Sequence, residues 1–292
     1  MGMRERQRLR SEGAPDRTAA PRSERASAGR RRTRATIEPR VTAHPISSSC
    51  PLASGGVADV RTVEEFYAAV ETAIPELDER LRVFVDEYRR HRASTGRPLS
   101  VLDVGCGRLA VLQEHITAED EYFACDLVEP LKPLPNFQSV NLNEDSLRDA
   151  FAGREFDVVF CGEVIEHVFS PDAVLSDLKA LLRPGGVLIL STPNLGYWVN
   201  RLLLLAGISP LFVENSANVK LGRRFRFLGQ GNDTQGHIRL FTYRAVRDLL
   251  DLQGFEVLRT RSVPVWTFPV DRLVCRVSRS LAPDNVYVAR RR

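Results

Sequence analysis

The chain has 292 residues, 43% of them hydrophobic, which is enough for one large folded domain with appendages. Its net charge of +4 is unevenly distributed. Residues 1–40 hold twelve arginines against five acidic residues and contribute +7, so the rest of the chain sums to −3 and nucleic acid is not indicated as a partner. Five scattered cysteines without a CxxC pair, together with the lack of a secretory signal or an 18-residue apolar run, predict a cytoplasmic protein without a transmembrane segment.

The N-terminal part of the chain divides into a polar tail and a helical segment. Residues 1–55 are rich in Arg, Ser, Ala, Pro and Gly and hold almost no large apolar side chains, which predicts a disordered tail. A basic arm that binds nucleic acid or acidic membrane is the alternative for this tail. Over residues 61–95 we expect two helices, one after the capping box Thr62-x-x-Glu65 and one beginning at Pro75. The second helix has an apolar face made of Leu77, Leu81, Phe84, Val85 and Tyr88.

A glycine turn follows the first predicted strand. Ser100–Val104 is a β-branched and apolar run typical of a buried strand, and it leads into Gly105-Cys106-Gly107. After the turn, the apolar spacing from Leu109 to Ile116 predicts a helix. Glycines let the backbone approach a ligand and a helix N-terminus offers free N–H groups, so this pattern predicts a mononucleotide-like ligand.

Strands and helices alternate along the rest of the chain. The other predicted strands are Tyr122–Asp126, Phe137–Val140, Phe156–Cys161, Val187–Ser191, Phe255–Ser262 and Asn285–Ala289. The predicted helices are Leu147–Phe151, Pro171–Leu182 and one capped by Thr242 that runs through Leu252. This alternation predicts an α/β fold with a doubly wound, mostly parallel sheet, in which ligands bind at the carboxyl ends of the strands. Polar residues are expected at these ends: Asp103, Asp126, Asn143, Glu163 and Thr192.

Two ligands fit a glycine turn followed by an acid after the second strand. Residues 105–110 match the G-x-G-x-x-A form of the dinucleotide fingerprint, and Asp126 could bond a ribose. S-adenosylmethionine (SAM) also needs a carboxylate for its ribose, but it has no phosphate. A carboxylate at Asp103 would repel a pyrophosphate and suits a ligand with an amine and a sulfonium, which favours SAM over a nicotinamide dinucleotide.

Several motifs together resemble a class I SAM-dependent methyltransferase over roughly residues 96–292. They are VLDVGCG at 101–107, ACD at 124–126, FDVVFCGEVIEHV at 156–168, LRPGGVLILSTPN at 182–194 and the terminal VYVA. The resemblance implies a seven-stranded sheet whose last strand is antiparallel, with SAM as the cofactor.

The resemblance also implies roles for individual residues. Gly105 and Gly107 would lie against the methionine part of SAM, with Asp103 nearby, and Asp126 would hold the ribose hydroxyls. Leu142 and Asn143 would border the adenine, and Glu163 would close the site after the fourth strand. Leu109 stands where the family usually has a third glycine, which narrows the turn.

The segment after the fourth strand has two interpretations, of which the more specific is a metal site. Glu163, Glu166 and His167 have i, i+3, i+4 spacing, so on a helical turn they would share a face. With His237 as a fourth ligand they could hold Mg²⁺ or another divalent cation that lowers the pKa of an acceptor hydroxyl. Some small-RNA 2′-O-methyltransferases and ubiquinone-pathway O-methyltransferases have a similar Glu-x-x-Glu-His pattern. The alternative is a site without metal, where His167 orients the loop or acts as a general base.

The acceptor side is expected in the insertion 193–237, which we interpret as a lid or binding segment that includes a short helix, Asn200–Ala206. Tyr197 and Trp198 could stack on an acceptor or simply pack, and Arg223, Arg224 and Arg226 form a basic patch. The sequence predicts methyl transfer to a small-molecule, glycan or lipid-linked acceptor at oxygen, with His167 or His237 taking the acceptor proton. Two alternatives remain: a SAM-binding MetW-like partner protein without turnover, and an NAD-dependent oxidoreductase.

Overall fold

A computed structural model describes residues 77–222, 234–264 and 269–292. Three expectations lie outside these ranges: the tail over residues 1–55, the helix after Thr62, and the basic patch at Arg223, Arg224 and Arg226. The second expected helix lies inside them as α2, Glu79–Thr95. It begins after Asp78, whose side chain accepts a hydrogen bond from the N–H of Leu81 at 2.7 Å.

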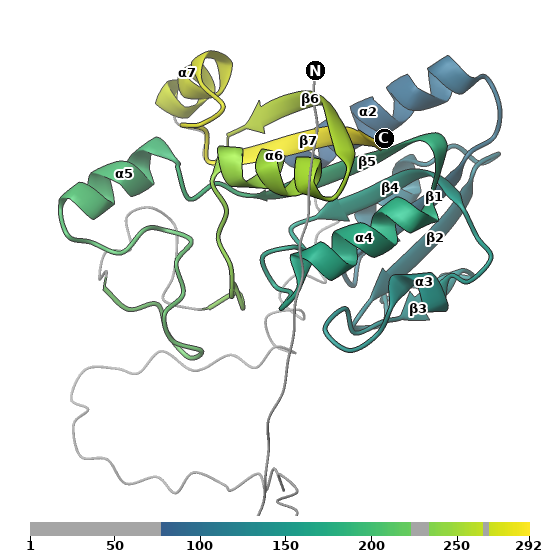
Figure 1. The fold of residues 1–292 in the computed structure, drawn as a ribbon, viewed down its shortest axis with the longest axis horizontal. Coiled ribbons are helices and arrows are strands. Elements are labelled where there is room, and N and C mark those ends of the chain that lie inside the picture. The colour runs from purple at the N-terminus through teal and green to yellow at the C-terminus, as the bar shows by residue number, and fades with distance from the viewer. Residues whose placement is uncertain (1–76, 223–233, 265–268) are drawn as a thin grey trace, which may run out of the picture. The chain divides into compact units, whose positions relative to one another are not determined.

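Seven strands form one sheet in the order β3-β2-β1-β4-β5-β7-β6 (Figure 1). Their bounds are β1 Ser100–Val104, β2 Glu121–Asp126, β3 Phe137–Ser139, β4 Phe156–Gly162, β5 Leu182–Pro193, β6 Phe255–Val263 and β7 Asp284–Arg291. The first five strands pair in parallel, whereas β7 runs antiparallel to both β5 and β6. The predicted doubly wound, mostly parallel α/β fold with an antiparallel last strand is therefore confirmed.

Helices cover both faces of the sheet, and alternate strand residues point to opposite faces. On one face α2 packs against β4, where the ring centroids of Phe84 and Phe160 are 5.7 Å apart. The helices of the other face are α3 Leu147–Ala150, α4 Pro171–Leu181 and α6 Tyr243–Leu252. Val159 and Cys161 of β4 point into the core of that face. Burial on both faces explains why β1, β4 and β5 contain continuous apolar runs.

The segment after the glycine turn differs from expectation. A 3₁₀ helix, Val111–His115, stands where an α-helix was predicted, so that prediction was wrong. Ala110 has a left-handed φ of 43°, and its C=O accepts a hydrogen bond from the N–H of Gln113 at 3.0 Å. A non-glycine residue in this conformation interrupts the α-helical path, because the following turn closes with the tighter i to i+3 pattern.

Two further helices, α5 (Trp198–Leu205) and α7 (Pro269–Val277), lie close together at one end of the sheet (Figure 1). The buried carboxylate of Asp271 on α7 connects them. It accepts hydrogen bonds from the Tyr197 hydroxyl at 2.8 and 2.9 Å and from Nε1 of Trp198 at 2.8 Å. The ring of Tyr197 is fully buried, so it packs and does not stack on an acceptor.

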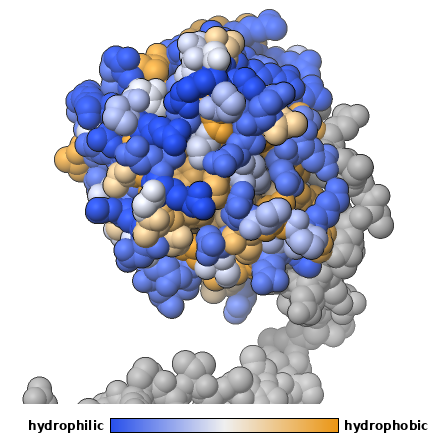
Figure 2. Space-filling view, turned by 90° about the vertical axis from the view of Figure 1, so that its right-hand side faces the viewer, coloured by the Kyte–Doolittle hydropathy of each residue, from blue (hydrophilic) through white to orange (hydrophobic). Residues whose placement is uncertain are grey.

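The molecular surface is mainly hydrophilic on the face shown in Figure 2. On the face shown in Figure 2, hydrophilic residues dominate and hydrophobic ones lie between them, mostly toward the middle. Within the described ranges, no helix combines the length and the apolar character needed to cross a bilayer.

The carboxylate of Asp157 connects three parts of the chain at the amino end of β4. It accepts hydrogen bonds from Arg97 at 2.5 Å, from Arg183 at 2.7 Å and from the N–H of Ser100 at 2.9 Å. Burial raises the pKa of Asp157, but these donors outweigh burial and hold the pKa below its usual value. The ionised carboxylate thus stabilises the fold above the ordinary aspartate pKa, and this contribution is lost as the pH falls below it.

We expect Asp157→Ala to lower the free energy of unfolding by about 2–3 kcal/mol at pH 7, because a charged acceptor is lost and the Ser100 N–H is left without it. Urea denaturation measures this loss, and the deficit should shrink below about pH 4. The control is the exposed Asp248, whose replacement by alanine should change stability by no more than about 0.5 kcal/mol. Equal stability of the two variants would contradict the connecting role.

Candidate active site

The glycine turn leaves β1 at the carboxyl edge of the sheet. Gly105 and Gly107 both have left-handed backbones, with φ of 74° and 66°. A Cβ at Gly105 would lie 2.4 Å from the side chain of Val164, whereas a Cβ at Gly107 would meet nothing within 4 Å. Packing therefore requires glycine at 105, and Gly107 faces open space that a ligand can enter.

Asp126 ends β2 beside this turn. Its Oδ2 accepts a hydrogen bond from the N–H of Gly107 at 2.8 Å, and its Oδ1 accepts one from the N–H of Val128 at 3.2 Å. Each carboxylate oxygen has further lone pairs, so both can still accept hydrogen bonds from a ligand. The N–H groups of this site belong to the turn itself and not to an α-helix N-terminus, which corrects the expected geometry.

Asp103 lies on β1, two residues before Gly105, and is 4% exposed. Tyr122 donates its hydroxyl hydrogen to Oδ2 of Asp103 at 2.7 Å. Burial raises the pKa of Asp103 to about 7 against the effect of that hydrogen bond, and the charge of Asp126 adds to the rise. A cationic group nearby would stabilise the ionised form, so the position suits a ligand with an amine or a sulfonium.

Leu142 and Asn143 follow β3 at the same edge of the sheet. Leu142 is half-buried and packs against the core, whereas Asn143 is exposed. The side-chain Oδ1 of Asn143 accepts a hydrogen bond from the N–H of Phe169 at 2.7 Å. This bond joins the segment after β3 to the segment after β4.

Glu163 does not share a helical face with the other expected metal ligands, because residues 163–167 form a turn and not a helix. It has a left-handed φ of 56° directly after β4. Its Oε1 accepts a hydrogen bond from Oγ of Ser191 at 2.7 Å and lies 3.4 Å from Nη1 of Arg80 on α2. The expectation that Glu163 is one of the metal ligands is therefore corrected, since its side chain contacts Ser191 and Arg80 instead.

The other three expected ligands do converge. One ligand atom from each of Glu166, His167 and His237 lies within 4.8 Å of the other two, and the two imidazole centroids are 4.9 Å apart. Nδ1 of His167 lies 3.1 Å from the carbonyl of Gly236, and Nδ1 of His237 lies 3.2 Å from that of Phe212. Carbonyls only accept hydrogen bonds, so Nδ1 carries the hydrogen in each ring and Nε2 of the neutral ring keeps a lone pair. Burial lowers the pKa of His237, which favours that neutral form.

Glu166 supplies the carboxyl group of this cluster and is fully buried. Its Oε2 accepts a hydrogen bond from Oγ1 of Thr192 at 3.0 Å, whereas its Oε1 has no hydrogen-bond partner among the described residues. Burial, and then the charge of Glu163, raise the pKa of Glu166 well above its usual value. A buried carboxylate oxygen without a donor, beside two imidazole lone pairs, is a donor set that fits a divalent cation.

Sequence reasoning missed three side chains that hold these groups: Arg80, Ser191 and Glu214. The carboxylate of Glu214 accepts a hydrogen bond from the N–H of His237 at 3.0 Å. Arg80 and Glu214 are part of no motif, and their contacts cross 83 and 23 positions of the chain, so no local signal could have found them.

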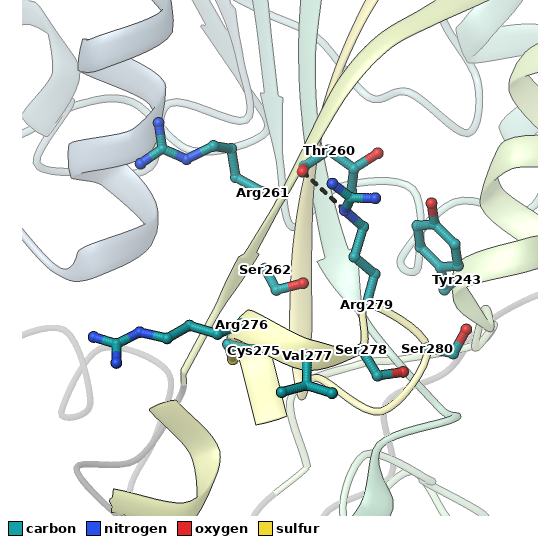
Figure 3. Close-up of a pocket in the computed structure, with 10 residues that line it drawn as sticks. All are labelled: Tyr243, Thr260, Arg261, Ser262, Cys275, Arg276, Val277, Ser278, Arg279 and Ser280. Atoms are coloured by element: carbon teal, nitrogen blue, oxygen red, sulfur yellow. Dashed lines mark hydrogen bonds between the residues drawn. The ribbon is translucent and has the colours of Figure 1, made fainter. Parts of the chain in front are cut away.

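A cavity of about 530 Å³ lies elsewhere, between β6 and the end of α7 (Figure 3). Three arginines, Arg261, Arg276 and Arg279, line it, and Nε of Arg279 donates a hydrogen bond to the carbonyl of Thr260 at 3.2 Å. None of the described residues that line this cavity is acidic, and none is an expected site residue. Its charge does not suit a cationic cofactor.

Known proteins resemble part of the chain. In curated proteins, 106 residues are 36% identical to a ubiquinone biosynthesis O-methyltransferase of Haemophilus ducreyi, and 102 residues are 38% identical to one of Xanthomonas campestris pv. campestris. Each alignment covers 32% of this chain, and 45% and 43% of the two relatives. The chain thus spans less than half the length of these two relatives.

Solved structures resemble the chain at lower identity. A 1,6-didemethyltoxoflavin-N1-methyltransferase of Burkholderia thailandensis is 19% identical with a TM-score of 0.46, covering 81% of this chain and 93% of that one. A SAM-dependent methyltransferase of Clostridium acetobutylicum is 12% identical with a TM-score of 0.48, covering 78% and 98%. The family model described as a methyltransferase domain matches residues 77–260, which is more than half of the chain. Together with the sheet order, this match shows that the chain belongs to the class I SAM-dependent methyltransferases.

Proposed function

We propose that this protein transfers the methyl group of SAM to a hydroxyl oxygen of a small-molecule, glycan or lipid-linked acceptor. The observation that supports it most is the pairing of Asp126 with the open glycine turn at the carboxyl edge of the sheet. The names of the ubiquinone O-methyltransferase relatives favour oxygen as the acceptor atom. Family membership removes the reason for keeping the oxidoreductase alternative.

In this proposal, SAM lies across the ends of β1, β2 and β3. Asp126 accepts hydrogen bonds from the ribose hydroxyls, and Leu142 and Asn143 border the adenine. The backbone of Gly105 and Gly107 contacts the methionine part, whose amino group is near Asp103. Glu163, held by Ser191 and Arg80, closes the site on the side of β4.

The reaction needs little covalent chemistry from the protein. The acceptor oxygen attacks the methyl carbon, the C–O bond forms as the C–S bond breaks, and S-adenosylhomocysteine (SAH) leaves with the sulfur lone pair. The protein contributes by holding the oxygen and the methyl group in line and by excluding water. The hydroxyl proton has to leave as the new bond forms.

The cluster of Glu166, His167 and His237 acts on that hydroxyl. We propose that these three residues hold a divalent cation, which when bound lowers the pKa of the acceptor hydroxyl. The unpartnered Oε1 of Glu166 and the two Nε2 lone pairs support this assignment. Without a cation, Nε2 of His167 or His237 takes the proton as a general base. The lone pair on Nε2 of a histidine cannot bind a cation and accept the hydroxyl proton at the same time, so an experiment can distinguish the two roles.

Asp126→Ala should weaken SAH binding about a hundredfold or more, because two hydrogen bonds to a charged acceptor are lost. Isothermal titration calorimetry measures this change. The matched control is Asp172→Ala, an exposed acid on α4 that bonds Gln253 and should leave the affinity within about twofold. Retained SAH affinity in the Asp126 variant would remove the ribose role.

Affinity for SAH should rise with pH around the pKa of Asp103. The carboxyl is mostly neutral at pH 5.5 and mostly ionised at pH 7.5, since its pKa is about 7. An ionised carboxylate attracts the ligand's amine, so we expect a gain of roughly tenfold over this range. Asp103→Asn should flatten the profile, and an unchanged profile in that variant would assign the dependence to another group.

Removal of the cation should lower turnover if the cluster binds one. EDTA should reduce methyl transfer, and Mn²⁺ should restore it, in an assay of labelled SAM with an acceptor identified by screening. His237→Ala should lower both turnover and Mn²⁺ affinity while SAH affinity stays within about twofold, and His115→Ala should change neither. Turnover that survives both EDTA and His237→Ala would reject the cation site. SAH binding without turnover on any acceptor would favour the non-catalytic partner protein.

A further inference from the structure

A buried carboxylate outside the catalytic cluster contacts the loop that carries His237. The side chain of Glu214 is 3% exposed. Its Oε1 accepts a hydrogen bond from the N–H of Gln235 at 2.8 Å. Its Oε2 accepts hydrogen bonds from Gly236 at 2.8 Å and from His237 at 3.0 Å. Three consecutive backbone N–H groups therefore converge on one side chain, which fixes the path of the chain into His237.

A buried lysine, Lys220, neutralises the charge of the Glu214 carboxylate. Nζ of Lys220, whose side chain is 4% exposed, is 3.5 Å from Oε1 of Glu214. Burial alone would raise the pKa of Glu214, but the N–H donors of residues 235–237 hold the pKa below its usual value. The carboxylate is therefore ionised, and its hydrogen bonds to the loop are charge-assisted.

The same segment also holds the ring of His237. Phe212, two residues before Glu214, is buried with Tyr197 and Leu211. Its carbonyl is the group that accepts the hydrogen bond from Nδ1 of His237. Residues 212–214 thus fix both the backbone of His237 and the orientation of its imidazole, one nitrogen of which lies within 4.8 Å of a ligand atom of Glu166 and of His167.

Gly236 connects Glu214 to the imidazole of His167 through two hydrogen bonds. The N–H of Gly236 donates to Glu214, and its C=O accepts the hydrogen bond from Nδ1 of His167. Gly236 has a left-handed φ of 85°, which glycine adopts without strain. A Cβ at this position would lie 3.5 Å from Nδ1 of His167. The residue that Glu214 anchors is therefore also the residue that orients His167.

We propose that Glu214 is a positioning residue that holds the imidazoles of His237 and, through Gly236, of His167 in the arrangement that binds a cation. The inference rests on the proposed cation site. Groups that orient metal-ligating histidines from behind typically contribute about 10–100-fold to metal affinity. A residue that only stabilised the loop would change the melting temperature without a selective effect on cation binding.

The test uses the full chain, with Mn²⁺ alone and SAH alone as probes in calorimetry. Glu214→Ala should weaken Mn²⁺ binding about 10–100-fold and leave SAH affinity within about twofold. Glu214→Gln should lie between wild type and alanine, because it keeps one carbonyl oxygen but turns an NH₂ group toward an N–H or toward Lys220. The matched control is Asn215→Ala, next in the chain, which bonds Leu221 and should bind Mn²⁺ like wild type.

Each outcome decides a separate point. Wild-type Mn²⁺ affinity in Glu214→Ala, or an equal loss of SAH affinity, would overturn the positioning role. If the wild type binds SAH but no Mn²⁺, the cation site fails and ¹⁵N NMR of His237 decides the positioning role. In that case wild type should show hydrogen on Nδ1, and Glu214→Ala should lose this preference. If Glu214→Ala does not fold, Glu214→Gln is measured in the same way, and wild-type behaviour in it would overturn the proposal.

Discussion

One hydrogen bond, from the backbone N–H of Gly107 to the carboxylate of Asp126, joins the carboxyl ends of β1 and β2, on which the proposed cofactor site depends. The bond links the turn after β1 to the last residue of β2, so the open space at Gly107 and a carboxylate with spare lone pairs lie together. Parallel pairing of β1 with β2 makes this contact possible, because their carboxyl ends reach the same edge. Asp103, two residues earlier on β1, adds a second acidic group whose ionisation a cationic ligand would favour.

The cluster of Glu166, His167 and His237 is assembled from segments that are distant in sequence. The backbone carbonyl of Glu166 accepts hydrogen bonds from the N–H groups of Ile238 and Arg239 at 2.9 and 3.1 Å, which brings the loop after residue 234 against the end of β4. Asn194, just after β5, accepts from the N–H of Tyr243 at 3.2 Å and donates to the carbonyl of Ala282 at 2.7 Å. These bonds keep α6 and the start of β7 in place around the cluster.

Local sequence was sufficient wherever burial or capping alone decides the structure. The central strands β1, β4 and β5 were predictable because a strand covered on both faces contains a continuous apolar run, and α6 was predictable because Thr242 caps it through the N–H of Ala245. The placement of Asp126 and Asn143 at one edge followed from parallel topology. Ala110 in a left-handed conformation, the turn at Glu163 and the anchoring of His237 by Glu214 were not predictable, because tertiary contacts fix them.

A crystal structure of the full chain grown with saturating SAH measures the central claim directly. The account predicts SAH along the carboxyl edge, with its ribose hydroxyls on Asp126 and its amino acid part against Gly105 and Gly107. Electron density for SAH in the arginine-lined cavity of Figure 3, with the space beside Gly107 empty, would contradict it.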